Sequence, residues 1–265
     1  MRARLILFLG ALVAGCAGSK AAVRPYPAPD SDELLAALRA RQAAVTSVSL
    51  ETRATSWLGG ERARGTVQML VDRSGDLRFE AEVSLQGTVA ALAVHQGRFI
   101  FVDHQKKTFR QGPATPGNVA TLIRIPLEPR QVAAILLGDG AIPAQAGVVD
   151  VGWDGARGAD VLHMQDAFGQ LWISLRRSAP DRYDVVALEG QSPGASRPWR
   201  VSYEDLHSTG GWMFPNLIRF AEPGHSFDDG VEIKVKDRIL NPTLPADAFV
   251  ISPPPGYTPE QPPGP

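Results

Sequence analysis

The chain has 265 residues, of which 44% are hydrophobic, and its formal net charge is −1. This length allows one large domain with a sizeable core, and the near-zero charge lacks the basic footprint of a nucleic-acid-binding protein. Cys16 is the only cysteine, so the core is expected to be stabilised by apolar burial without an internal disulfide.

Residues 1–15 have the layout of a secretory signal peptide. Arg2 and Arg4 precede an apolar stretch, 5–13, which is too short to span a bilayer. The small residues before Cys16 resemble the bacterial lipobox, in which the cysteine becomes the acylated N-terminus. The alternative is an ordinary signal peptide that contains a cysteine by chance. We expect a lipoprotein that carries acyl chains such as palmitate on Cys16 and is anchored without a transmembrane helix.

Residues 16–29 are predicted to form a lipidated, solvated tether, because small residues and three prolines favour an extended spacer. A helix is predicted next. Asp30 is the expected N-cap, with Glu33 in the capping-box position. Apolar residues then follow at helical spacing as far as Val45.

From Val48 the apolar residues alternate with a period of two, which predicts β-strands. The candidate strands of this first set are 48–54, 67–71, 77–83, 88–95 and 98–104. The last two are apolar on both faces, so something must cover each side of the sheet. Residues 117–124 and 129–137 are predicted helices that supply part of this cover, and the second ends before Gly138.

A second set of period-two segments follows the helices. The candidate strands of this set are 147–153, 160–165, 170–177, 182–189, 199–205, 212–221 and 230–236. One mainly β (α+β) domain is therefore predicted over residues 30–251. The proline-rich tail, 252–265, is predicted to be flexible or polyproline II and not to pair as a strand.

The sequence offers little catalytic or metal-binding chemistry. Residues 190–194 fit the G-x-S-x-G pattern of a nucleophile elbow, but Pro193 and the following loop replace the helix that such an elbow needs. None of the five histidines has the spacing of a metal site. We expect no enzymatic activity, no metal and no cofactor.

Two segments, 83–109 and 118–138, resemble the LolA/LolB-like superfamily of bacterial lipoprotein-sorting proteins, and most of all its outer-membrane receptor branch, LolB. In that pattern a loop leucine beside a glycine is followed by two strands and a helix. An I-P-L link, here 125–127, then leads to an apolar helix closed by Gly138. The stretch 241–257 is more similar to the periplasmic carriers, LolA.

The resemblance implies an incomplete, strongly curved antiparallel β-barrel of about 11 strands, with helices as a lid over an apolar cavity that takes acyl chains. The small side chains around Ala91 favour space beside the sheet. The residues expected to line or adjoin this cavity are Ala91, Leu92, Val94, Phe99, Phe101, Val132, Ile135 and Leu136. The alternative is that the helices complete a solid core.

The resemblance also places Leu85 in a loop that inserts into the membrane. Ser84 stands where the family often has proline. The alternative is that Leu85 folds back onto the edge of the sheet, because single exposed leucines are common.

Ala17, rather than aspartate, follows Cys16, which in enterobacterial-type sorting does not signal retention in the inner membrane. We therefore expect a monomer on the periplasmic face of the outer membrane that assists lipoprotein localisation or lipid transfer. The expected partners are the membrane, lipid or lipoprotein acyl chains and a periplasmic carrier protein, without nucleic acid. The alternative is a scaffold or sensor lipoprotein that uses the same fold without transport.

Overall fold

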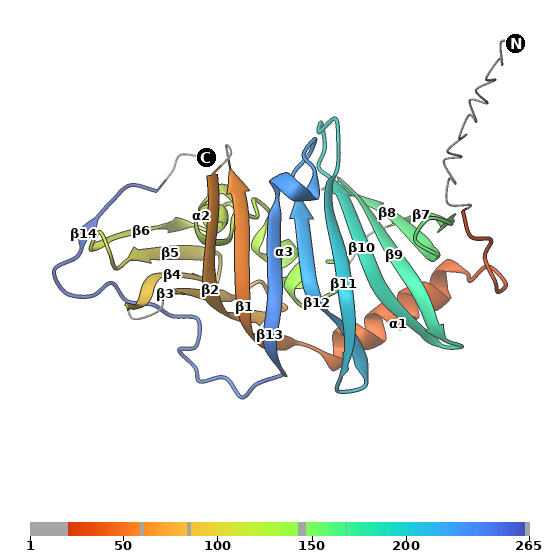
Figure 1. Cartoon of the computed structure of the whole chain (residues 1–265), viewed down its shortest axis with the longest axis horizontal. Coiled ribbons are helices and arrows are strands. Elements are labelled where there is room, and N and C mark those ends of the chain that lie inside the picture. The colour runs from red at the N-terminus through yellow and green to blue at the C-terminus, as the bar shows by residue number, and fades with distance from the viewer. Residues whose placement is uncertain (1–20, 59–60, 84–85, 143–146, 168, 263–265) are drawn as a thin grey trace, which may run out of the picture.

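The computed structural model describes residues 21–58, 61–83, 86–142, 147–167 and 169–262. Over these ranges, fourteen strands form one curved sheet that is not closed into a barrel, and helices lie against it (Figure 1). This confirms the predicted mainly β fold, an incomplete antiparallel barrel with helices. The number of strands is larger than the expected 11 or so.

The sheet consists of two antiparallel meanders. The strands of the first are β1 Ser47–Leu58, β2 Glu61–Asp72, β3 Leu77–Val83, β4 Gly87–His95, β5 Arg98–Asp103 and β6 Thr108–Pro113. The strands of the second are β7 Gly147–Asp154, β8 Ala159–Asp166, β9 Gly169–Ala179, β10 Arg182–Gln191, β11 Trp199–Thr209, β12 Trp212–Ala221 and β13 Val231–Leu240, with a short 3-10 turn, η1 Phe227–Asp229, before β13. The two meanders join where β1 pairs with β13, with Val48 opposite Leu240.

The three predicted helices are present within the described residues. They are α1 Ser31–Ala44, α2 Pro116–Ile123 and α3 Pro129–Leu136. The predicted N-cap of α1 is confirmed, because the Asp30 carboxylate accepts a hydrogen bond from the Glu33 amide at 2.7 Å. We call α2 and α3 the lid, since they lie against β4, β5 and β2 on the inner face of the sheet.

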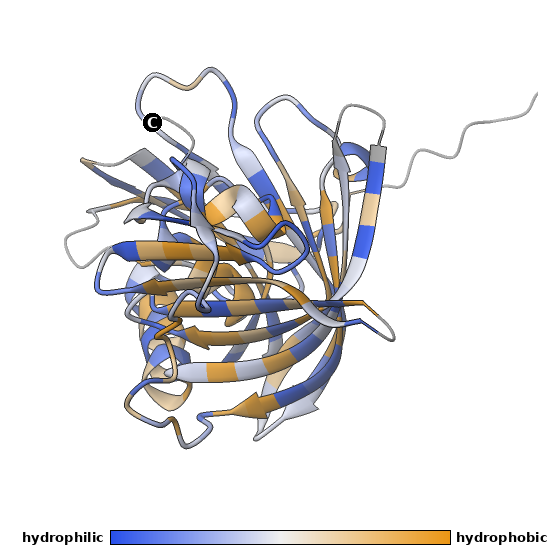
Figure 2. Cartoon of the chain, turned by 90° about the vertical axis from the view of Figure 1, so that its left-hand side faces the viewer, coloured by the Kyte–Doolittle hydropathy of each residue, from blue (hydrophilic) through white to orange (hydrophobic). Residues whose placement is uncertain are grey.

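Alternate residues of the strands face the helices and form the core. Met69 lies opposite Phe79, and Leu92 lies opposite Phe101, on neighbouring strands. All four side chains are buried, and they share one cluster with Val132 of α3. Successive residues of a strand point to opposite faces, so apolar and polar residues alternate along the strands (Figure 2). The concave side of the sheet is therefore the apolar side.

The end of the chain pairs with the sheet. Strand β14, Thr258–Pro259, runs parallel to β6. The Thr258 amide donates to the Lys107 carbonyl at 3.0 Å, and the Glu260 amide donates to the Phe109 carbonyl at 2.8 Å. The prediction that the tail cannot pair is wrong, because only alternate residues donate to the neighbouring strand and the proline falls between them.

The segment between β13 and β14 crosses the outer face of the first meander (Figure 1). The guanidinium of Arg78, on β3, donates to the carbonyls of Ala248 at 3.1 Å and Val250 at 3.4 Å. Ala248 and Phe249 are buried. The sequence predicts that both faces of the first meander are covered. The chain's own C-terminal segment covers part of the outer face.

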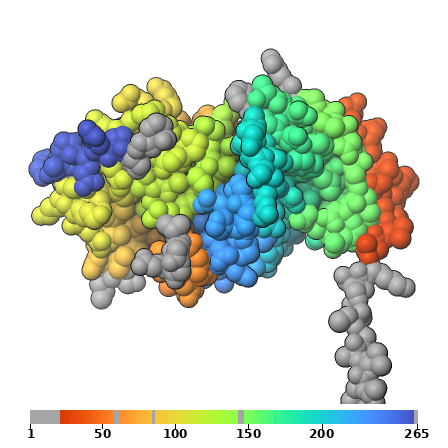
Figure 3. Space-filling view, turned by 90° about the horizontal axis from the view of Figure 1, so that it is seen from above, coloured from red at the N-terminus to blue at the C-terminus, as the bar shows by residue number. Residues whose placement is uncertain are grey.

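The two terminal segments lie at opposite ends of the long axis of the molecule (Figure 3). Residues 21–29 belong to the predicted tether, yet the Ala22 amide donates to the Gly155 carbonyl between β7 and β8 at 2.9 Å. Cys16 and Leu85 lie outside the described residues. No helix within the described ranges is long and apolar enough to cross a membrane.

Candidate functional site

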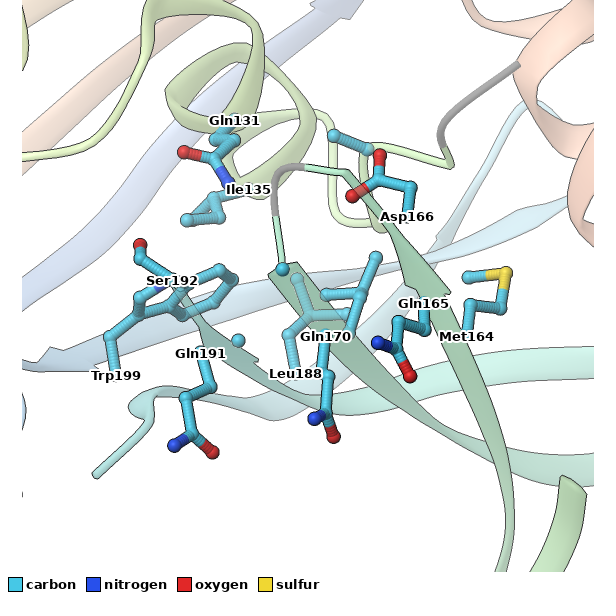
Figure 4. Close-up of a pocket in the computed structure, with 14 residues that line it drawn as sticks. Gln131, Ile135, Met164, Gln165, Asp166, Gln170, Leu188, Gln191, Ser192 and Trp199 are labelled. Carbon is cyan, nitrogen blue, oxygen red and sulfur yellow. The ribbon is translucent and has the colours of Figure 1, made fainter. Parts of the chain in front are cut away.

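A small cleft lies between α3 and the strand ends of the second meander (Figure 4). Its apolar wall includes Ile135 of α3, Leu188 of β10 and Trp199 of β11. Gln131 also reaches it from α3. The cleft has a volume of about 70 Å³, which is far below the roughly 300–1,000 Å³ of ordinary ligand pockets. The cleft as it stands is therefore too small to hold a long acyl chain.

Gly190 shapes one wall of this cleft. A Cβ atom at position 190 would lie 2.2 Å from the Trp199 ring, so the indole rests directly on the glycine backbone. The residues after Ser192 form turns and no helix before β11. The G-x-S-x-G pattern thus has a packing explanation here and lacks the strand–helix context of a nucleophile elbow.

Seven of the eight predicted cavity residues lie in the apolar core cluster. These seven residues are Leu92, Val94, Phe99, Phe101, Val132, Ile135 and Leu136. Each is at least 94% buried, and Ile135 also lines the cleft. The structure thus brings the two strands and the lid together as predicted, with their side chains in mutual contact rather than around a large cavity.

Ala91 is placed differently. It lies opposite Glu80 on β3, whereas Leu92 faces the core. This outer face is crossed by the C-terminal segment, where Arg78 bonds the Ala248 carbonyl. Because β4 alternates, the small side chain of Ala91 adjoins the outer surface and not the lid. The structure separates it from the other seven candidates.

A buried polar cluster holds the end of α3. Asp139 follows the helix, and its carboxylate is fully buried. The Arg73 guanidinium donates to both carboxylate oxygens, at 3.1 and 3.0 Å, and the Arg41 Nε atom lies 3.9 Å from one of them. Burial raises the pKa of Asp139, while the two arginines act in the opposite direction. The carboxylate charge therefore depends on both arginines.

Arg41 reaches the same place from α1. It is 2% exposed and donates to the Leu137 carbonyl at 3.3 Å and to the Met213 carbonyl at 2.9 Å. Burial lowers the pKa of Arg41, and the Asp139 charge opposes this shift. Gly138 lies between these groups at φ +76°, where a Cβ atom would approach the Arg41 guanidinium to 3.1 Å. A glycine is required there for both reasons.

Two further side chains bond carbonyls at the end of the helix and just beyond it. The Tyr203 hydroxyl donates to the Ile135 carbonyl at 3.0 Å and lies 3.4 Å from the Asp139 carbonyl. The Gln42 amide donates to the Gly140 carbonyl at 2.9 Å. Burial raises the pKa of Tyr203 well above its ordinary value, so the hydroxyl stays protonated and remains a donor.

We call this cluster the latch; its members are Arg41, Gln42, Arg73, Asp139 and Tyr203. The last carbonyls of a helix have no partner within the helix, and Arg41 of α1 and Tyr203 of β11 supply partners here. Arg73, in the β2–β3 turn, binds the Asp139 carboxylate instead, so the latch ties the end of the lid to both meanders. A buried polar network is stable while complete and weak once one member is lost, so the latch suits a lid that opens as a unit.

Sequence reasoning missed the latch, although two signals were present. Arg41 stands at helical spacing with Leu34 and Leu38, in an otherwise apolar stripe. Asp139 stands between two glycines directly after an apolar helix. A charge in either position is unexpected at the sequence level, and the two charges meet in the structure.

A second groove lies on the outer face, under the C-terminal segment. It has a volume of about 310 Å³ and is lined by Gln68, Arg78, Glu80 and Pro245, among others. The two charged residues of its wall, Arg78 and Glu80, pair with each other at 2.7 Å, and the wall also includes Met69 and Leu70. Within the described residues, no three His, Cys, Asp or Glu side chains are grouped so as to hold a metal ion.

No family model and no curated protein matches the sequence. Several solved structures are similar to this chain in fold. A LolA superfamily protein from Nitrosomonas europaea aligns with a TM-score of 0.57 and 12% identity, over 82% of this chain and 97% of that one. A putative outer membrane lipoprotein-sorting protein domain from Vibrio parahaemolyticus gives a TM-score of 0.55 and 9% identity, over 82% and 95% of the two chains.

A DUF1329 family protein from Desulfovibrio piger is similar to the same degree, with a TM-score of 0.57 and 9% identity over 82% of this chain and 94% of that one. At such identities the similarity shows a shared fold. The resemblance to the LolA/LolB-like superfamily is thereby confirmed at the level of the fold.

Proposed function

We propose that this chain is a lipid-anchored envelope protein that binds the acyl chains of a lipid or lipoprotein between its curved sheet and its lid. In this role it assists lipoprotein localisation or lipid transfer. The observation that carries the proposal is an apolar interior closed by two helices whose end is held by a buried polar latch. The fold shared with lipoprotein-sorting proteins supports it.

Opening the lid is energetically feasible for an acyl chain. Each buried CH₂ group contributes about 0.8 kcal/mol. Each latch hydrogen bond contributes about 0.5–1.5 kcal/mol, or up to about 3 kcal/mol where a charged group takes part. A long chain that enters between the lid and the apolar strands leaves the lid's apolar side chains covered, so its own burial can offset the loss of several latch contacts.

The test is lipid binding by the soluble form of the protein, made with Cys16→Ser and without the signal peptide. We expect lipid to co-purify with it, and we expect a fluorescent fatty acid to bind and to be displaced by unlabelled palmitate. A protein that is free of lipid and binds no fatty acid would instead favour the scaffold or sensor role, which the small volume of the cleft would then explain.

The anchor is tested separately. In the proposed function Cys16 is acylated and the protein resides on the periplasmic face of the outer membrane. Full-length protein should fractionate with the outer membrane, and Cys16→Ser should be released from it. Normal processing and membrane fractionation of the variant would remove the anchor from the proposal.

The membrane-insertion role of Leu85 also belongs to the proposal. Val83, at the end of β3, is 44% exposed, so this strand end presents an apolar side chain that a membrane could cover. Leu85→Glu should abolish delivery of cargo to liposomes while folding and cargo binding persist. Ile239→Glu is the control, since Ile239 is an aliphatic residue of β13 that is 54% exposed. Delivery by Leu85→Glu at the parent rate would contradict this role.

A further inference from the structure

The segment that follows the expected anchor is bound to the β7–β8 turn. The Ala22 amide donates to the Gly155 carbonyl at 2.9 Å, and the Trp153 indole donates to the Ala22 carbonyl at 2.7 Å. A Cβ atom at Gly155 would lie 2.8 Å from the Ala22 carbonyl oxygen. This close approach of two backbones therefore depends on a glycine in the turn.

Asp160 is the centre of this contact. Its side chain is fully buried, and it forms an ion pair with the Arg24 Nε atom at 2.9 Å. The Tyr26 hydroxyl donates to its other oxygen at 2.9 Å. Arg24 also donates to the Gly152 carbonyl at 3.1 Å. The loss of such partners from a buried carboxylate is strongly destabilising. The bound segment therefore stabilises the sheet, and the sheet holds the segment in place.

Aromatic contacts complete the arrangement. The Tyr26 ring meets the Trp153 ring edge-on, with their centroids 6.0 Å apart. The Arg24 guanidinium lies 5.2 Å from the centroid of the Trp153 ring, and that of Arg177 lies 5.0 Å from the centroid of the Tyr26 ring. We call Ala22, Arg24 and Tyr26, bound in this way, the clasp.

The clasp limits how far the domain can stand from its anchor. Six residue steps separate Cys16 from Ala22, and a fully extended chain spans at most about 3.6 Å per residue, so the limit is about 22 Å. From the clasp we infer that the β7–β8 turn is the part of the domain held against the lipid surface. This inference rests on the proposed acylation of Cys16.

If the β7–β8 turn is held against the membrane, the cleft lies at the end of the second meander that is farther from the membrane. Strands β8 and β10 begin at the β7–β8 and β9–β10 turns. They end at the β8–β9 and β10–β11 connections, which border the cleft. A strand of the length of β8, eight residues, spans about 26 Å at roughly 3.3 Å per residue. The clasp thus places the β7–β8 end of the second meander near the membrane and the cleft end farther from it.

Energy transfer from a single label to a lipid dye tests this orientation. Full-length acylated protein is reconstituted in vesicles that contain a headgroup-labelled acceptor lipid. Because the native cysteine is consumed by acylation, Ala156→Cys and Ser192→Cys each offer one reactive thiol, and both positions are exposed. We expect higher transfer from position 156, with apparent distances that differ by up to about 26 Å.

The matched variant is Arg24→Ala together with Asp160→Asn, which removes both charges of the pair and leaves no charge buried alone. It should reduce the difference between the two labels while circular dichroism shows a folded sheet. Equal or reversed transfer in the parent protein would overturn the inference while leaving the anchor intact. Protein that does not float with the vesicles would overturn both the anchor and the inference.

Discussion

Asp139 is the latch residue whose substitution should reduce the stability of the protein most. Asp139→Ala removes the carboxylate that lies 3.9 Å from the buried Arg41, and breaking a buried pair in this way costs about 3–5 kcal/mol. We expect a fall of that size in the free energy of unfolding, measured by urea denaturation. Glu260→Ala is the control. The Glu260 side chain is 44% exposed and pairs with Arg110, and surface pairs contribute about 0–1 kcal/mol. Similar losses in the two variants would contradict the importance of the latch.

Gly190 gives a second prediction at this scale. In Gly190→Ala the new methyl group would meet the Trp199 ring, so the indole has to move, at a cost of about 1–3 kcal/mol. The tryptophan emission spectrum should shift and the free energy of unfolding should fall. Gly152→Ala, where a Cβ atom meets nothing within 4 Å, should leave both unchanged. An unshifted spectrum in Gly190→Ala would show that Trp199 does not lie on this glycine.

Individual residues also show where sequence reasoning succeeds and fails. The cap at Asp30 was predictable, because it depends on local chain geometry alone. The face of Ala91 was not, because both faces of β4 are apolar and the sequence does not say which segment covers which face. The partners of Asp139 come from three distant parts of the chain, and no local pattern joins them.

Among the elements, β14 protects the edge of the sheet at β6. Removing residues 252–265 deletes the Thr258 and Glu260 hydrogen bonds and exposes the unpaired groups of β6, which is a template for pairing with other chains. We expect the truncated protein to associate at concentrations where the parent is monomeric, as measured by light scattering. Removing only 263–265 keeps the paired residues and should have no effect. A monomeric 252–265 deletion would show that β6 needs no cover.

The elements that were predicted well are those with a strong period. The three helices and most strands follow from apolar spacing and caps. Strand β6 was missed because its sequence, TFRQGP, does not alternate. Strand β14 was missed because prolines normally exclude pairing. It pairs because Pro259 falls at a position that need not donate a hydrogen bond to β6.

For the molecule as a whole, the latch should control the rate at which the interior opens. Tyr203→Phe removes the hydroxyl that bonds the end of α3. If about 1.4 kcal/mol of lid stability is lost, opening becomes about tenfold more frequent. Stopped-flow uptake of a fluorescent fatty acid should accelerate accordingly. Tyr183→Phe is the matched control, because the Tyr183 hydroxyl bonds Glu33 of α1 and does not touch the lid. Equal rates in the two variants would contradict the latch as the gate.

The pairing of β1 with β13 has a consequence for the order of events during folding. Each meander is built from neighbouring strands and can form as its own residues arrive, but Val48 must wait for Leu240. Pairings between distant parts of a chain form slowly. During that interval the edge of β1 that will face β13 has no neighbour, so a newly synthesised chain passes through a period in which it can pair with other chains. Pulse-labelling hydrogen exchange should find β1 and β13 among the last strands to gain protection.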